Sequence, residues 1–293
     1  MPLTLSRRTL LAGAASMLST PSIRAQTTPD SAFEKRVGAI EKREGGRFGV
    51  AAFDSGSGRR LAHRGDERFP LCSTFKFLAA AAILAQVDQG KETLDRRIAY
   101  KQSDILEYSP ETEKHVGDGG MTVGALCAAA VQLSDNTAGN LLLTALGGPA
   151  GLTGYCRSLG DGVTRLDRIE PFLNDVPPGD ERDTTTPAAM IGLMERLHLG
   201  NALTPASRAQ LDGWMAGTTT GVKRLPAILP PGWRIGHKTG AGQRGATNDV
   251  AIFWPSSRPP VLIAAYFAGS SSPIEQREAA IAEAGRAALE SFG

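Results

Sequence analysis

"PLCSTFKFLAAAAIL", residues 70–84, is an apolar, alanine-rich run that predicts a buried helix with a serine near its start. Lys76 follows Ser73 by three residues, and residues three apart share one face of a helix, so we expect the hydroxyl and the amine to be neighbours. A helix start also has unpaired N–H groups and a positive dipole end, which stabilise developing negative charge. The run predicts either a serine nucleophile or a capping serine followed by a lysine that extends to solvent.

The segments on either side of this run predict one antiparallel sheet with helices inserted into its sequence. The first two strand-like runs are joined by SGSG, which is typical of a hairpin. The predicted strands are 47–54, 59–65, 233–240, 247–255 and 259–269. The predicted helices include 31–44, 74–89, 122–133, 136–146, 187–199 and 273–292. We therefore expect an α+β fold, an α/β sandwich in which a five-stranded antiparallel sheet is flanked by the terminal helices and carries an inserted all-helical lobe.

This organisation divides the chain into two lobes. Residues 26–68 and 218–293 form the predicted sheet lobe, and residues 69–217 form the predicted helical lobe. The helical lobe contains a stretch from 160 to 186, here called the 160–186 loop, with three prolines and little periodicity. A loop of that length is usually either functional or disordered. Because binding pockets favour interfaces, we expect the active site where the two lobes meet.

The composition is that of a globular protein and argues against two classes of function. Of 293 residues, 41% are hydrophobic and 21% are charged, and the formal net charge is +2. No block of like charge runs along the chain, so we expect no nucleic-acid partner. The four histidines are scattered without the spacing of metal ligands, so we expect no metal site.

Residues 1–25 have the features of an export signal. Arg7 and Arg8 precede an apolar stretch from 10 to 18 that is too short to span a bilayer. The arginine pair resembles a twin-arginine signal, and cleavage is plausible after Ala25. We therefore expect a periplasmic or secreted protein, with no stable membrane association after cleavage and acting as a monomer.

Three further motifs follow Ser73-x-x-Lys76. They are SDN at 134–136, RIEPFLN at 168–174 within the 160–186 loop, and KTG at 238–240 near the end of a strand. In this order the four motifs resemble those of the class A serine β-lactamases, and the resemblance covers essentially the whole mature chain. Four motifs in order are far more specific than any one of them, since Ser-x-x-Lys alone is expected by chance about once in a chain of this length.

The chemistry of these residues supports nucleophilic catalysis by Ser73 independently of the family resemblance. A serine hydroxyl is a weak nucleophile and needs an adjacent base. Lys76 can serve if burial keeps part of it neutral, and Glu170 can serve through a water molecule. Ser134 would pass a proton to the leaving nitrogen, with Lys238 nearby. Which base takes the proton from Ser73 stays open.

The resemblance implies hydrolysis of penicillins and cephalosporins through an acyl-enzyme on Ser73, without metal or organic cofactor. It places the oxyanion hole at the backbone N–H groups of Ser73 and Ala241. It assigns the ion pair of Arg168 with Asp183 to the base of the 160–186 loop. The expected substrate contacts are Tyr108, Asn136, Asn174, Lys238, Thr239, Gly240 and Ala241. Each of these residues, taken singly, could instead be a solvated or capping residue.

Two related classes remain as alternatives. D-alanyl-D-alanine carboxypeptidases and transpeptidases share Ser-x-x-Lys and Lys-Thr-Gly but lack the loop with Glu170. A non-catalytic β-lactam receptor domain would also lack that base. Because nothing primes a hydrolytic water in those proteins, their acyl-enzymes persist. The presence of Glu170 therefore favours the β-lactamase.

The cysteines bear on substrate range. We expect no structural disulfide among Cys72, Cys127 and Cys156, and Cys127 is typical of a small buried side chain. Some carbapenem-hydrolysing members pair a cysteine before the nucleophile, here Cys72, with a second just after Lys-Thr-Gly. That second position is Gly242, so the disulfide cannot form. Carbapenem hydrolysis is neither implied nor excluded.

The sequence also departs from the family at its usual carboxylate-binding arginine. Many members carry that arginine on the strand after Lys-Thr-Gly, at the position of Thr247. Some members carry a compensating arginine at the place of Arg224. We therefore expect Arg224 to hold the substrate carboxylate, directly or through Thr239 and water. The alternative is a solvated surface arginine beside Lys223.

Overall fold

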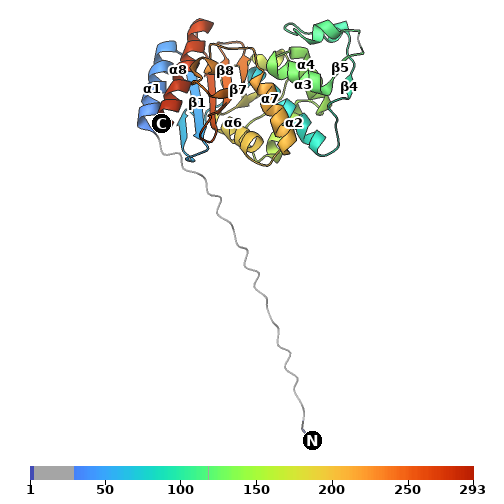
Figure 1. Cartoon of the computed structure of the whole chain (residues 1–293), viewed down its shortest axis with the longest axis horizontal. Helices are drawn as coiled ribbons and strands as arrows, with labels where there is room; N and C mark the ends of the chain where they lie inside the picture. Colours follow the sequence, from blue (N-terminus) through green and yellow to red (C-terminus); the bar gives the residue numbers. More distant parts are fainter. Residues whose placement is uncertain (3–29, 118) are drawn as a thin grey trace.

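The computed structural model describes residues 1–2, 30–117 and 119–293 of the chain. The terminal helices α1 (Ser31–Glu44) and α8 (Ile274–Phe292) pack against each other on one face of the sheet (Figure 1). The Asp30 side chain accepts the backbone N–H groups of Ala32 and Phe33 and so caps α1. The predicted signal segment, except for its first two residues, lies outside the described residues.

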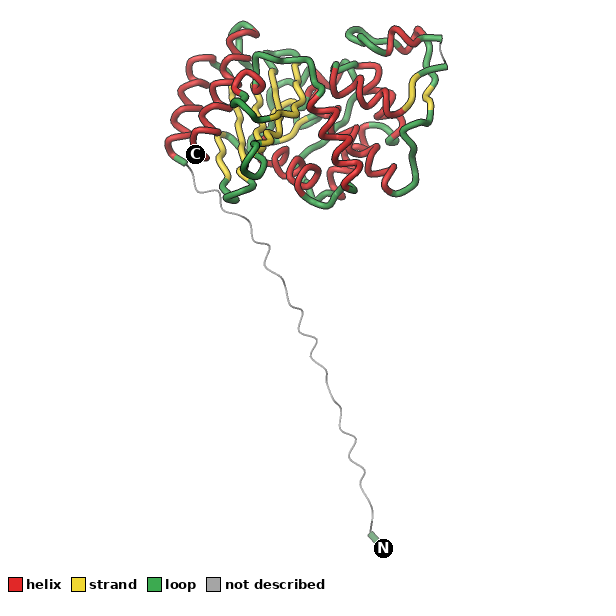
Figure 2. Tube along the Cα trace, viewed as in Figure 1, coloured by secondary structure: helices red, strands yellow, loops and turns green. Residues whose placement is uncertain are grey.

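The central sheet has five antiparallel strands, as predicted. Its strands are β1 (Arg47–Asp54), β2 (Arg60–His63), β7 (Arg234–Ala241), β8 (Thr247–Trp254) and β9 (Val261–Ala268). The strands lie together in one sheet (yellow in Figure 2). Their order is β2-β1-β9-β8-β7, so strands from the two ends of the chain are neighbours. This order leaves β7, which carries the Lys-Thr-Gly motif, at an edge of the sheet.

The helices from the middle of the chain form a lobe beside the other face of the sheet, and α6 and α7 pack directly on its strands. They are α2 (Phe75–Asp88), α3 (Val123–Gln132), α4 (Asn136–Ala145), α5 (Pro149–Ser158), α6 (Pro187–Met194) and α7 (Pro205–Ala216). Two short ribbons lie among them: β3 (Phe69–Pro70) with β6 (Thr184–Thr185), and β4 (Arg97–Ile98) with β5 (Met121–Thr122). The side chains of α2 from Phe75 to Ala85 are buried all round, which explains why its sequence is apolar on every face.

The sheet separates two hydrophobic cores. One lies between the sheet and the terminal helices and includes Phe33, Phe48 and Ile281. The other lies between the opposite face and the inserted helices and includes Phe77, Leu142 and Val250. Alternate residues of each strand enter the two cores, which is why β9 is apolar throughout its length and β8 is apolar from Val250 onward.

Most predicted boundaries agree with the structure within two residues, and three details differ. The helix predicted over 187–199 ends at Met194 and continues as a π-helical turn from Glu195 to Leu199. The second strand is shorter than predicted, at 60–63. The 160–186 loop contains a short 3-10 turn, Phe172–Asn174, and the strand β6. Among the described residues, no helix is long and apolar enough to cross a membrane.

Candidate active site

Ser73 lies in a 3-10 turn, Cys72–Thr74, that leads directly into α2. Cys72 before it has φ +44°, a left-handed conformation that is unusual for a residue with a side chain. The turn packs against β7, and Ser73 is only 8% exposed. The Nζ atom of Lys76 lies 3.0 Å from Ser73 Oγ, so the predicted neighbourhood of hydroxyl and amine is confirmed. The alternative of a lysine that extends to solvent is wrong, because Lys76 is fully buried.

Lys76 is the centre of the polar contacts around the serine. Besides Ser73, its Nζ donates to the backbone oxygen of Ser134 at 2.8 Å and to Asn136 Oδ1 at 2.7 Å. Glu170 Oε1 lies 3.1 Å from the same nitrogen. Burial lowers the pKa of the Lys76 amine, and the nearby Glu170 carboxylate partly opposes that shift. The site therefore holds a lysine that gives up its proton more readily than a lysine in water.

The Glu170 carboxylate is buried beside the serine. Its Oε1 accepts from Ser73 Oγ at 3.3 Å, and its Oε2 accepts from Asn174 Nδ2 at 2.5 Å. The side chain of Asn140 on α4 holds the Glu170 backbone, since it accepts the N–H at 2.9 Å and donates to the carbonyl at 3.0 Å. We did not predict Asn140 from the sequence. The available signal was its position four residues after Asn136, on the same face of one helix.

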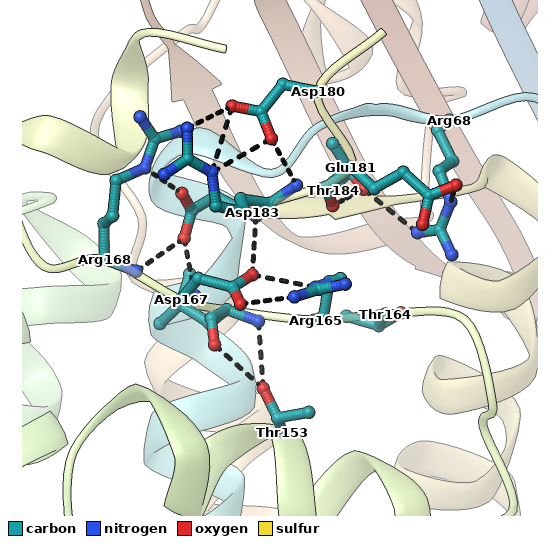
Figure 3. Close-up of polar contacts among 12 residues, drawn as sticks. Arg68, Thr153, Thr164, Arg165, Asp167, Arg168, Asp180, Glu181, Asp183 and Thr184 are labelled. Atoms are coloured by element: carbon teal, nitrogen blue, oxygen red, sulfur yellow. Dashed lines mark hydrogen bonds and ion pairs between the residues drawn. The ribbon is translucent and has the colours of Figure 1, made fainter.

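The base of the 160–186 loop is held by ion pairs (Figure 3). Asp183 Oδ2 accepts from Arg168 Nε at 2.5 Å, and Oδ1 accepts the backbone N–H groups of Asp167 and Arg168. A second pair joins Arg165 to Asp167. The pairing of Arg168 with Asp183, which was expected from the family, is thus present. A buried carboxylate that receives three hydrogen bonds fixes the two ends of the loop relative to each other.

Ser134, in the connection between α3 and α4, faces Lys238 of β7 across the site. Lys238 Nζ donates to Ser134 Oγ at 2.9 Å and to the Thr239 carbonyl at 2.9 Å. Burial and the charge of Lys76 hold the pKa of Lys238 well below its ordinary value. The turn of Ser134, whose φ is +60°, is held by buried Asp135, which accepts the Thr112 N–H and hydroxyl. From the sequence, the alternative interpretation of Ser134-Asp135-Asn136 is a helix-capping cluster, and Asp135 does cap α4 by accepting the Ala138 N–H at 2.8 Å.

The end of β7 approaches both Cys72 and the 160–186 loop. A Cβ atom on Gly242 would lie 2.7 Å from Cys72 Sγ and 2.6 Å from the Asn174 carbonyl oxygen, so only glycine fits without a shift. Cys72 is a buried free thiol whose pKa is raised by burial. Beside it a cavity of about 1040 Å³ opens between the loop and β7. It is lined by Pro149, Ile169, Phe172, Asn174, Ala241 and Gly242 among others.

Arg224 lies behind β7 and is not at the surface. It is 6% exposed, and its Nη1 donates to the carbonyl oxygens of Gly240 at 3.0 Å and Asn248 at 2.8 Å. Its Nε pairs with Glu278 at 3.1 Å. The alternative of a solvated surface arginine is therefore wrong. The Thr239 hydroxyl, which faces the site, is bonded to Thr220 at 2.6 Å and is the group through which Arg224 was expected to act.

Tyr108 lies at the rim of the site and is 57% exposed. Its backbone has φ +59°, and its carbonyl accepts the backbone N–H of Asn136 at 3.0 Å. Within the described residues, no group of three His, Cys, Asp or Glu side chains could hold a metal ion. The site is therefore built from hydroxyl, amine, amide and carboxylate groups.

This chemistry defines an enzyme of the serine acyl-transfer class, because a serine hydroxyl within reach of two buried bases is an activated nucleophile. Residues 32–292 match the profile of the "Beta-lactamase enzyme family". The chain is 45% identical over 259 residues to beta-lactamase CTX-M-8 of Citrobacter amalonaticus, covering 88% of this chain and 89% of that protein. It is 43% identical to beta-lactamase Toho-1 of Escherichia coli, over 98% and 97% of the two chains.

Solved structures agree with these relatives. An ancestral class A beta-lactamase, GNCA, matches with 59% identity and a TM-score of 0.87, over 89% of this chain and all of that one. PenP of Rhodopseudomonas palustris, a putative class A beta-lactamase, matches with 53% identity and a TM-score of 0.87, over 89% and 99% of the chains. The chain therefore belongs to the class A β-lactamases.

Proposed function

We propose that the protein hydrolyses the lactam amide of penicillins and cephalosporins through an acyl-enzyme on Ser73, and so confers resistance to them. The observation that carries this proposal is the buried Glu170 carboxylate, 3.3 Å from Ser73 Oγ, on a loop closed by an ion pair. A base in that position can activate water against an ester on Ser73. The alternative peptidase and receptor classes lack such a base.

In acylation, Ser73 Oγ attacks the lactam carbonyl while a base takes its proton. Lys76 Nζ at 3.0 Å and Glu170 Oε1 at 3.3 Å are both within hydrogen-bond reach, so the geometry supports either acceptor. The lowered pKa of Lys76 favours a partly neutral amine, which can accept a proton. The negative charge that develops on the carbonyl oxygen would be stabilised by the backbone N–H groups of Ser73 and Ala241.

The leaving nitrogen must gain a proton for the ring to open. Ser134 Oγ is placed for this role, and Lys238 Nζ donates to it at 2.9 Å. A substrate carboxylate bound beside Lys238 would favour its charged form, and that charge would lower the cost of the alkoxide that forms when Ser134 gives up its proton. The C–N bond breaks as the proton reaches nitrogen, which leaves the acyl group as an ester on Ser73. Ser134 then regains a proton from the base that took the Ser73 proton, so that both return to their starting states.

Deacylation would use Glu170 with Asn174. Glu170 takes a proton from a water molecule, whose oxygen attacks the ester carbonyl and releases Ser73. Within the described residues, Asn174 Oδ1 is buried without a protein partner, while its Nδ2 holds the carboxylate. An unpaired buried amide oxygen beside the base is suited to orient such a water.

Substrate binding would use the edge of β7 and the loop opposite. Lys238 and Thr239 would meet the substrate carboxylate, with the charge of Arg224 behind the strand. Asn136 and Asn174 would contact the acyl amide, and the backbone of Gly240 and Ala241 would run beside it. Tyr108 would border the entrance, and the cavity of about 1040 Å³ leaves space for acyl side chains.

The deciding experiment is turnover of a chromogenic cephalosporin by purified residues 26–293. We expect multiple turnovers, whereas stoichiometric binding without turnover would favour the peptidase or the receptor. Ser73→Ala should abolish covalent labelling by benzylpenicillin. Glu170→Ala should still be acylated but release product very slowly, so intact-mass spectrometry should find the adduct. Normal turnover by the Glu170 variant would contradict the role of the loop.

We also propose export through the twin-arginine route and a periplasmic or secreted location. The support is the Arg7-Arg8 pair and the apolar stretch after it. Changing both arginines to lysine should leave the precursor in the cytoplasm. Periplasmic activity in that double variant would instead indicate the general secretory route.

A further inference from the structure

Asn248 on β8 connects the sheet to the turn that carries the nucleophile. Its side chain is completely buried, and its Nδ2 donates to the carbonyl oxygens of Pro70 at 2.9 Å and Leu71 at 3.2 Å. The Leu71 oxygen also accepts the N–H and the hydroxyl of Thr74, at 3.2 and 2.7 Å. One carboxamide therefore holds both carbonyls that immediately precede the turn Cys72–Thr74.

The same residue is fixed to the opposite wall of the site. Asn248 pairs with Gly240 in the register of β7 and β8. A Cβ atom on Gly240 would lie 3.0 Å from Asn248 Nδ2, 3.1 Å from the Leu71 oxygen and 3.2 Å from Cys72 Cβ. The carboxamide thus occupies the contact between β7 and the nucleophile's turn. Ser73 follows that contact on one segment, and Ala241 follows it on the other.

We propose that Asn248 is a positioning residue that sets the spacing of the oxyanion hole. The inference rests on the proposed function, in which the two donors are the backbone N–H groups of Ser73 and Ala241. These donors stand on separate segments, the turn and β7, and Asn248 is bonded to the first and paired with the second. Donors stabilise a developing oxyanion only when they are held at the correct distance before the reaction.

The hydrogen-bond inventory of Asn248 distinguishes this role from simple filling of the core. Its Oδ1 is buried without a partner among the described residues. A half-paired buried amide costs free energy that an apolar side chain of similar size would avoid. Both hydrogen bonds that the amide does make go to the segment that carries the nucleophile. The turn that Asn248 holds also contains Cys72 at φ +44°, a conformation that needs support from its surroundings.

The test is Asn248→Ala in the mature protein, with the active-site concentration measured by titration. We expect kcat/KM for benzylpenicillin to fall by roughly 10- to 100-fold, because misplacing a reacting group by about 1 Å costs on the order of 100-fold. Affinity for an arylboronic acid, which forms a tetrahedral anion on the serine, should fall by the same factor. Binding of intact benzylpenicillin should be equal in Ser73→Ala and Ser73→Ala/Asn248→Ala, since neither forms the anion.

The matched control is Ile252→Val, a buried change on the same face of β8 that does not reach the turn. It should lose stability but keep kcat/KM and boronate affinity within twofold. If Asn248→Ala behaves like this control, or loses intact-substrate binding as much as boronate affinity, the positioning role is wrong. Failure of the proposed function is distinguishable, because the unmodified protein would then show no turnover at all.

Discussion

Replacing Arg224 with alanine should weaken recognition of the carboxylate that penicillins and cephalosporins carry beside the lactam ring. Arg224 is buried behind β7, where Nη1 donates to the Gly240 and Asn248 carbonyls. After burial and the charge of Lys76, the charge of Arg224 contributes to holding the pKa of Lys238 low, so its field reaches the site. A carboxylate bound at Lys238 would experience the same field.

The magnitude follows from the contacts. A charge-assisted hydrogen bond contributes about 1.5–3 kcal/mol, so we expect a 10- to 100-fold loss in kcat/KM for Arg224→Ala. If the contact is equal in ground and transition states, the loss appears mainly in KM. Glu278, 3.1 Å from the Arg224 Nε, offsets part of this charge. Removing that carboxylate leaves the charge of Arg224 without its opposing partner, so Glu278→Gln should improve kcat/KM severalfold.

The assay is steady-state hydrolysis of benzylpenicillin by both variants, with active-site titration to correct for unfolded protein. Clavulanate carries the same carboxylate and should inactivate Arg224→Ala less efficiently. Lys223→Ala, an exposed neighbour on the same segment, is the matched control and should stay within twofold. If Arg224→Ala also stays within twofold, the arginine is structural only. A loss of activity in Glu278→Gln would show that the ion pair, rather than the cation alone, is required.

Three further changes have specific expected outcomes. Arg168→Ala removes the 2.5 Å ion pair with Asp183 at the base of the 160–186 loop. Deacylation should slow by at least 10-fold and acylation by less, and pre-steady-state kinetics should show this as a larger burst of product. Gly242→Ala forces a shift of the loop and should cost roughly 1–3 kcal/mol in urea unfolding, whereas Gly154→Ala, with nothing within 4 Å, should not. Between the lowered pKa of Lys238 and the ordinary lysine value, the unfolded chain binds a proton that the folded chain lacks, so the free energy of unfolding rises with pH. In urea titrations from pH 7 to 9.5, Lys238→Met should show a smaller slope, since the lowered pKa of Lys76 still contributes, and it should lose all hydrolysis.

The order and type of the main elements could be predicted because they depend on local pattern. The apolar run of 250–254 and the apolar run after Ser73 are properties of adjacent residues, and the structure places the first in a strand and the second in a helix. The π-helical turn after Met194 could not be predicted in this way. Glu195 and His198 there are set by partners elsewhere in the chain, Arg60 and Asp212. Such contacts leave no periodic signal.

The catalytic motifs could be predicted, whereas the residues that hold them could not. Asn140, Asp135 and Asn248 each make their decisive bonds to backbone atoms, and a backbone atom has no sequence identity to recognise. For Asn248 a weak signal existed, because Asn248 and Asp249 interrupt an otherwise apolar strand. Polar residues at fully buried strand positions need hydrogen-bond partners. Their presence in the sequence therefore indicates a buried contact, although it does not identify the partner residue.

Charge balance gives the physical reason why these polar groups lie together. Lys76 and Lys238 are fully buried, and burial lowers the pKa of both amines. Keeping a buried ammonium charged is costly unless a carboxylate lies close to it. Glu170 lies beside Lys76, and Asp249, bonded to the N–H of Leu225, opposes the lowering of the Lys238 pKa. A substrate carboxylate would add one more negative charge at Lys238 and favour its charged form. Binding and protonation of the site are therefore coupled, and a carboxylate-free lactam should lose both contributions together.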